Sequence, residues 1–172
     1  MKKIRRGMFE TNSSSTHTII ITNSKTEPGL CVDFRIDEFG WEREDYHDVY
    51  SKASYIYTLA CACLGRDVFP DFCDMLCKYG VKCTCSRPAR INTSTYRGET
   101  YTYLDNGYVD HDYEGRKLVD AIMSDEDRLI RYLFSDESLV VTGNDNVDED
   151  YFKEMEEATT VDYDHEEYYK GN

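Results

Sequence analysis

The order of hydrophobic and polar residues along the chain predicts several short strands and helices. Residues 17–22 are a β-branched run, HTIIIT, which is typical of a buried strand. Apolar and polar residues alternate over residues 30–36, as in a half-exposed strand. From Val49 to Leu64 the apolar residues recur with the spacing of a helix, and Gly65 ends the pattern.

The rest of the chain predicts further short elements. Helices are expected at residues 69–79, 116–123 and 126–134, and the last of them begins at a cap formed by Ser124. Strands are expected at residues 81–85 and 139–142. The sequence Asp105-Asn106-Gly107 favours a hairpin turn between residues 100–104 and 108–110, whereas residues 37–48 and 86–99 are polar enough to be loops.

This order of elements is typical of one α+β domain. A length of 172 residues fits a single domain. We expect a mixed or antiparallel sheet with several short helices packed on it. Residues 1–145 would form this domain. Residues 146–172 would form an acidic helix, near residues 149–157, and a tail that belongs to the same unit.

The charge of the chain is strongly negative and unevenly distributed. Its formal net charge is −14, from 34 acidic and 20 basic residues. Residues 1–30 have a balance of +3, whereas residues 144–172 have a balance of −9. Such acidity repels nucleic acid and anionic membranes, and no apolar stretch is long enough to span a membrane. Without a secretory signal, the chain is expected in the cytoplasm, where its seven cysteines would be free thiols.

The acidic carboxyl-terminal segment interleaves carboxylates with aromatic rings. Carboxylates spaced like backbone phosphates can occupy a basic nucleic-acid groove, and aromatic rings add contact area. On this interpretation the segment binds a basic nucleic-acid-binding protein. The residues expected at that interface are Asp148, Glu149, Asp150, Tyr151, Phe152, Glu154, Glu156 and Glu157. The alternative is an acidic tail that is simply solvated.

Three polar segments at the ends of expected strands indicate a second kind of site. Residues 10–17 include three adjacent serines, whose hydroxyl and backbone N–H groups can bind a phosphate. Residues 110–112 and 143–146 are the other two segments. If all three meet, His17, His111 and Asp110 would provide acid–base chemistry, and the ligand or its phosphate would be bound by Asn12, Ser13, Ser14, Ser15, Asn144 and Asp145. Alternatively, each segment is a turn that satisfies its own backbone.

Four of the cysteines have a spacing that could hold a metal ion. Cys73 and Cys77 lie one helical turn apart, and Cys83 and Cys85 lie on one face of an expected strand. Four thiolates can bind a structural zinc ion in tetrahedral geometry. The spacing departs from the usual pair of CxxC motifs, however, and small buried cysteines explain it as well. No other cofactor is predicted.

The opening residues resemble those of a known group of proteins. Residues 6–17, RGMFETNSSSTH, are similar to the start of uncharacterised small proteins from phages and mobile elements of Firmicutes. The similarity extends to residues 37–41, 108–111 and 141–146, although the group has glutamine and serine where this chain has Asp112 and Tyr113. The resemblance implies a bacterial host and favours the polar segments as a site. Small acidic proteins of mobile elements are also often inhibitors of host defence, such as the anti-CRISPR proteins.

Two functions follow from these observations. The first is an acidic protein of a phage or mobile element that inhibits a nucleic-acid-binding host defence effector by mimicking nucleic acid. Such a protein is not an enzyme and contacts neither nucleic acid nor membrane. The second is a small enzyme or ligand-binding protein that acts on a phosphate-bearing nucleotide through residues 12–17. The sequence leaves the target, the ligand and the oligomeric state open.

Overall fold

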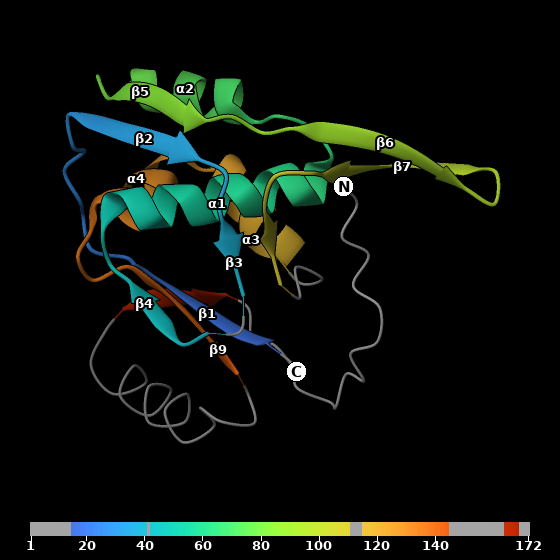
Figure 1. The fold of residues 1–172 in the computed structure, drawn as a ribbon. Helices are drawn as coiled ribbons and strands as arrows, with labels where there is room; N and C mark the ends of the chain where they lie inside the picture. Colours follow the sequence, from blue (N-terminus) through green and yellow to red (C-terminus); the bar gives the residue numbers. More distant parts are fainter. Residues whose placement is uncertain (1–14, 41, 111–114, 145–163, 169–172) are drawn as a thin grey trace.

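The computed structural model describes residues 15–40, 42–110, 115–144 and 164–168 and has an α+β fold (Figure 1). Within these ranges, four helices accompany one four-stranded sheet and three two-stranded sheets. Two of the pairs are parallel and the other sheets are antiparallel. The expected fold class, a mixed or antiparallel sheet with short helices packed on it, is confirmed. None of the helices in these ranges is long and apolar enough to cross a membrane.

The four-stranded sheet, called the main sheet here, joins segments from both ends of the chain. Its strands lie in the order β10 (His165–Tyr168), β1 (Ser15–Thr22), β9 (Leu139–Asn144) and β4 (Glu44–Tyr46). All eight residues of β1 are buried, as the β-branched run predicts. Both edge strands contain carboxylates, which protect a sheet edge from further pairing.

Helix α1 (Val49–Leu64) forms the centre of the core. It lies between the main sheet and the pair of strands β2 (Cys31–Arg35) and β5 (Lys82–Arg87) (Figure 1). Asp48 caps its first turn, and Gly65 ends it with a left-handed backbone of φ 62°. Ten consecutive residues, 52–61, are buried, so this helix is covered on all sides.

The remaining helices cover α1 and the parallel strand pair. Helix α2 (Phe69–Cys77) packs on β5, and the rings of Phe34 and Phe72 stack with centroids 5.2 Å apart. Helices α3 (Gly115–Met123) and α4 (Glu126–Phe134) pack against α1. The predicted cap of α4 was wrong by one residue, because Asp125 and not Ser124 accepts the backbone N–H of Arg128.

The predicted hairpin was also wrong. Strands β6 (Ile91–Tyr96) and β7 (Glu99–Leu104) form the hairpin, so residues 86–99 are not a loop. The turn is Arg97-Gly98, where both φ angles are positive, at 52° and 87°, as a two-residue hairpin turn requires. After the predicted turn at residues 105–107, strand β8 (Tyr108–Val109) pairs in parallel with β3 (Glu38–Phe39). Residues 37–48 therefore also contain strands.

Candidate functional site

The three polar segments meet, as far as the structure describes them, at one end of the main sheet. Ser15 begins β1 and lies opposite Asn144, the last residue of β9. The Ser15 hydroxyl donates a 2.6 Å hydrogen bond to Oδ2 of Asp110, which directly follows β8. Ser15 is buried, and the other two residues are half-buried. Residues from three distant parts of the chain thus form one polar cluster.

The position of Asp110 is fixed by the short parallel pair of strands. Its backbone N–H donates 2.8 Å to the carbonyl of Phe39, which continues the pairing of β8 with β3. The carboxylate then accepts the Ser15 hydroxyl in a partly buried setting, where a charge-assisted hydrogen bond is strong. This bond holds the end of β8 against the start of the main sheet.

His17 is buried in the core, where a catalytic acid or base could not reach a substrate. Its side chain is fully buried, and its Nδ1 is 2.9 Å from the hydroxyl of Tyr55 on α1. The two ring centroids are 5.8 Å apart. A general acid or base must come within hydrogen-bond reach of the reacting atom. The observed contacts instead connect β1 to α1 inside the core.

The other residues of the predicted ligand site lie outside the described residues: Asn12, Ser13, Ser14, His111 and Asp145. The residues of the predicted acidic interface also lie outside them: Asp148, Glu149, Asp150, Tyr151, Phe152, Glu154, Glu156 and Glu157. Of the acidic segment, only residues 164–168 are described. They include β10, where Glu166 pairs with Arg128 at 2.8 Å and with Arg131 at 3.3 Å.

Three of the four cysteines, Cys73, Cys77 and Cys83, interact electrostatically, and Cys85 lies against a different partner. Cys73 and Cys83 are hydrogen-bonded between α2 and β5, and burial raises the pKa of Cys83 to about 12. Cys85 contacts the Tyr57 hydroxyl at 3.9 Å, and Cys77 is exposed. The part of the chain that the structure describes contains no group of three or more His, Cys, Asp or Glu side chains that could hold a metal ion.

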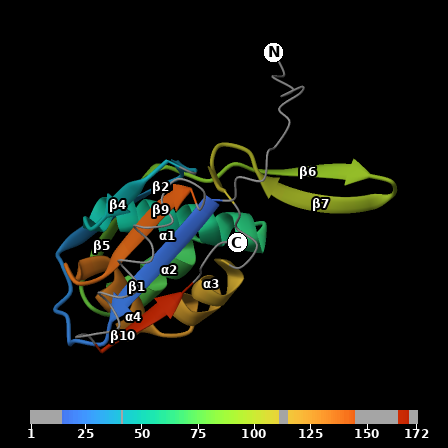
Figure 2. The same ribbon diagram turned by 90° about the horizontal axis from the view of Figure 1, so that it is seen from below.

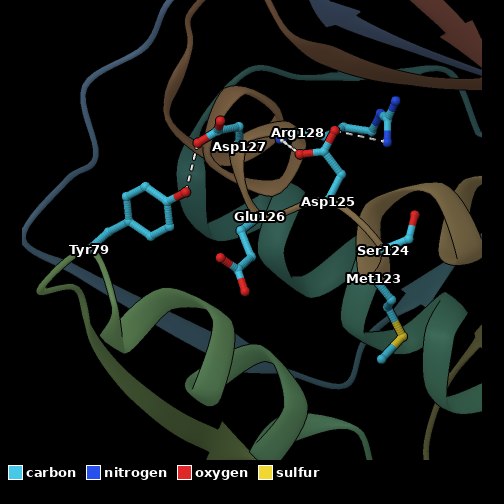
Figure 3. Close-up of a pocket in the computed structure, with 7 residues that line it drawn as sticks. All are labelled: Tyr79, Met123, Ser124, Asp125, Glu126, Asp127 and Arg128. Carbon is cyan, nitrogen blue, oxygen red and sulfur yellow. Dashed lines mark hydrogen bonds and ion pairs between the residues drawn. The ribbon is translucent and has the colours of Figure 1, made fainter.

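A hollow of about 540 Å³ lies at the start of α4 (Figure 3). Its lining includes Asp125, Glu126 and Asp127, and the Tyr79 hydroxyl donates 2.6 Å to Asp127 (Figure 3). Lys78 forms an ion pair with Glu126. The helix N-terminus that could attract a phosphate is therefore surrounded by carboxylates, which repel one.

The edge of the main sheet at β4 presents a more distinctive surface. We call it the β4 acidic surface and define it by five exposed residues, Glu42, Glu44, Asp45, Asp48 and Tyr50; Arg43 and His47 in the same stretch are exposed as well. Paired strand β4 and the cap of α1 fix its backbone, since Asp48 Oδ1 accepts two backbone N–H groups at 3.0 Å. Sequence reasoning placed the acidic interface at residues 148–157 and did not single out this surface. The available signal was six acidic residues and one basic residue between positions 37 and 48.

Comparisons with known proteins add no function to this geometry. No family model matches the chain. No curated protein and no solved structure matches it either. The polar cluster at the sheet end and the β4 acidic surface are thus the two features from which a function can be inferred.

Proposed function

We propose that the protein is a binding protein of a phage or mobile element that inhibits a nucleic-acid-binding protein of bacterial host defence. An acidic surface would dock on the basic groove of this partner in place of nucleic acid. The β4 acidic surface is the observation that supports the proposal. The sequence adds further negative charge at positions 148–157.

Two carboxylates of this surface are available to a cationic partner. Glu42 and Glu44 form no ion pair with any residue that the structure describes. The carboxylate of Glu44 hydrogen-bonds Tyr46, whose pKa is raised by burial and by this carboxylate. Arginine or lysine side chains of a partner could pair with these two carboxylates.

The surface also has the rigidity and the aromatic contact that protein interfaces use. Asp45 lies on a paired strand and Asp48 caps a helix, so docking immobilises little backbone. Tyr50, on the first turn of α1, is 54% exposed. Tyrosine is enriched among the residues that contribute most to binding energy. Nucleic-acid mimicry by this surface would therefore combine phosphate-like charge with one aromatic anchor.

The proposal is tested by the rate at which the protein associates with its partner. The partner is captured from a bacterial lysate at low salt, identified, purified and measured by interferometry. The triple variant Glu42→Gln, Glu44→Gln, Asp45→Asn should associate at least about tenfold more slowly, because electrostatic steering is lost. The same steering predicts a steep fall of the wild-type rate with added salt.

A matched control has the same change of net charge elsewhere on the surface. The variant Glu27→Gln, Asp74→Asn, Asp120→Asn removes three exposed carboxylates away from β4. Its association rate should fall only slightly. Equal losses in both triple variants, or an association rate that salt does not change, would refute docking through the β4 acidic surface.

A second candidate function is supported by the polar cluster. The approach of Ser15, Asp110 and Asn144 favours a small enzyme or ligand-binding protein that acts on a phosphate-bearing nucleotide through residues 12–17. Calorimetric titration with nucleoside mono-, di- and triphosphates tests it. Binding that is lost in Ser14→Ala and kept in Ser124→Ala would support this function, and the absence of any binding heat would reject it.

A further inference from the structure

The hairpin of β6 and β7, called the arm here, extends from the body of the molecule (Figures 1 and 2). Its two strands pair with each other and with no other described strand. At the root, Ile91 and Leu104 pack against the core. Beyond the root the strands are almost entirely exposed. An isolated two-stranded hairpin is only marginally stable in water, so a partner for the arm is physically expected.

The two faces of the arm differ sharply in composition. Residues directly opposite in the register share a face, and neighbours along a strand point to opposite faces. One face contains four threonines at positions 93, 95, 100 and 102. Thr102 on this face lies against the end of α1, because a Cβ atom on Gly65 would be only 2.1 Å from its hydroxyl oxygen. The threonine face therefore leans toward the body.

The opposite face, called the tyrosine face here, points away from the body. Tyr96, Tyr101 and Tyr103 lie on it and are 64%, 50% and 40% exposed. The rings of Tyr101 and Tyr103 are 6.2 Å apart, and the guanidinium of Arg97 lies 5.3 Å from the ring centre of Tyr96. Large exposed aromatic clusters of this kind mark interaction surfaces.

The charge of the arm indicates what kind of partner fits. Residues 91–104 contain one basic residue, Arg97, and one acidic residue, Glu99, in a chain with a net charge of −14. The tyrosine face therefore has no net attraction for phosphates or for a strongly charged protein. By the same register Glu99 lies on the tyrosine face opposite Tyr96, with Arg97 next to it in the turn, so the face is nearly neutral and suits an identical face, as in two-fold dimers.

We propose that the tyrosine face of the arm binds the tyrosine face of a second copy of this chain. Six residues of strand span about 20 Å, so two overlapping arms keep the two acidic bodies about that far apart. This separation exceeds the electrostatic screening length, which is about 8 Å at physiological salt. The arm thus lets two such acidic copies meet through a nearly neutral segment. The inference does not depend on the proposed inhibitory function.

The exposed area sets the strength of this dimer. If a tyrosine presents about 220 Å², the exposed parts of the three rings amount to roughly 340 Å² per arm. Two arms in contact bury roughly 700 Å² through their tyrosines, which is less than the about 1,200 Å² at the lower end of stable complexes. The structure therefore predicts a weak, reversible dimer.

Sedimentation velocity of the full chain tests the proposal over protein concentrations from about 5 to 500 µM, as a weak interface requires. The dimer fraction should rise with concentration and also with salt, because salt screens the repulsion between the bodies. Added salt should instead weaken docking to a basic partner, so a failure of this proposal can be told apart from a failure of the proposed function. A chain that stays monomeric over the whole range at both low and high salt overturns the proposal.

Substitutions locate the contact. Tyr96→Thr, Tyr101→Thr and Tyr103→Thr together should weaken dimerisation at least about tenfold while keeping strand-forming residues in the arm. Leu30→Ser and Tyr108→Thr, which change exposed residues of the body, are the matched controls and should leave dimerisation unchanged. A dimer that persists in the triple variant, or one that the controls disrupt, contradicts the proposal.

Cross-linking keeps the test independent of the stability of the arm. A photoreactive phenylalanine analogue in place of Tyr101 should join the peptides of residues 91–104 from two copies. Cross-links that reach only the body of a second copy overturn the arrangement. Binding of a single-stranded oligothymidylate that disappears in the triple variant also overturns it, since the face would then belong to nucleic acid.

Discussion

Lys52 offers the sharpest test of how this core is held together. The side chain is fully buried, and Nζ donates to the carbonyls of Ser135 at 2.7 Å and Ser138 at 2.9 Å. These two residues lie between α4 and β9, so the lysine connects α1 to the turn that leads into the main sheet. Two acceptors satisfy a neutral amine, whereas the third hydrogen of an ammonium group has no acceptor among the described residues.

The pKa of Lys52 is expected to reflect this environment. Burial lowers it from 10.5 to about 8, and the carboxylates of Asp136 and Asp48 oppose this effect only in part. The unfolded chain therefore binds more protons than the folded chain between about pH 8 and 10.5, and stability rises with pH across that window. The full difference between the two pKa values corresponds to about 3 kcal/mol.

Lys52→Met removes both hydrogen bonds and the buried titrating group. Near pH 7 the loss of the two hydrogen bonds destabilises the variant by about 3 kcal/mol. The variant also no longer buries a charged ammonium group, which stabilises it by about the same amount. The two free energies of unfolding should therefore agree within about 1 kcal/mol. Near pH 10.5 the wild type has recovered its stability, so the variant should be less stable by about 3 kcal/mol.

Urea unfolding followed by circular dichroism at several pH values measures this directly. The quantity to plot is the free energy of unfolding of the wild type minus that of the variant, because all other titrating groups cancel in the difference. Lys25→Met, whose side chain is 90% exposed, provides the control. A difference that stays constant or falls between pH 7 and 10.5 would refute the role assigned to burial.

Three further substitutions test separate parts of the fold by thermal or urea unfolding. Ser15→Ala leaves a partly buried carboxylate without its 2.6 Å donor and should cost about 1–2 kcal/mol; no loss would show that water replaces the hydroxyl fully. Gly65→Ala places a side chain at a φ of +62° and against Thr102 of the arm, so it should lower the free energy of unfolding by about 1–3 kcal/mol. Gly80→Ala has a similar φ but open space around it, and its loss should be smaller. Burial would raise the pKa of Glu166, but hydrogen bonds from a neighbouring tyrosine and from Arg128 lower it overall. Glu166→Gln should therefore cost stability at neutral pH, and the cost should vanish as acid protonates the wild-type carboxylate; a cost that persists in acid would contradict this.

The parts of the fold that local sequence controls were predictable. The limits of α1 agree with the prediction residue by residue, because Asp48 and Gly65 are local cap signals. Strand β1 agrees as well, apart from two residues at its start, because a β-branched run specifies it. These signals act within one turn or one strand and need no information from the rest of the chain.

The arm could not be predicted in the same way. Its strands have no buried face beyond the root, so the alternation of hydrophobic and polar residues that marks a strand is absent from residues 91–96. The turn at Arg97-Gly98 lacks the Asn-Gly or Asp-Gly signature, which occurs instead in the nearby residues 105–107. The stronger local signal therefore pointed to the wrong turn.

The candidate sites depend on pairing between distant segments. Sequence singled out Ser15, Asp110 and Asn144 as separate polar positions, but only the register of β1 with β9 and the pairing of β8 with β3 bring them together. His17 looked like a titrating group beside a polar loop. The alternation of strand side chains instead directs it to Tyr55 in the core.

The position of β10 determines how the acidic carboxyl-terminal segment can be studied. β10 pairs with β1 over four residues, and Glu166 on it meets two arginines of α4. A chain that ends before residue 164 would expose one edge of the buried strand β1 and leave Arg128 and Arg131 without their shared carboxylate. Loss of activity in such a truncation would then report a damaged fold and not a lost interface. Substitutions that neutralise Asp148, Glu149 and Asp150 without shortening the chain separate the two causes, because they remove charge and keep the strand.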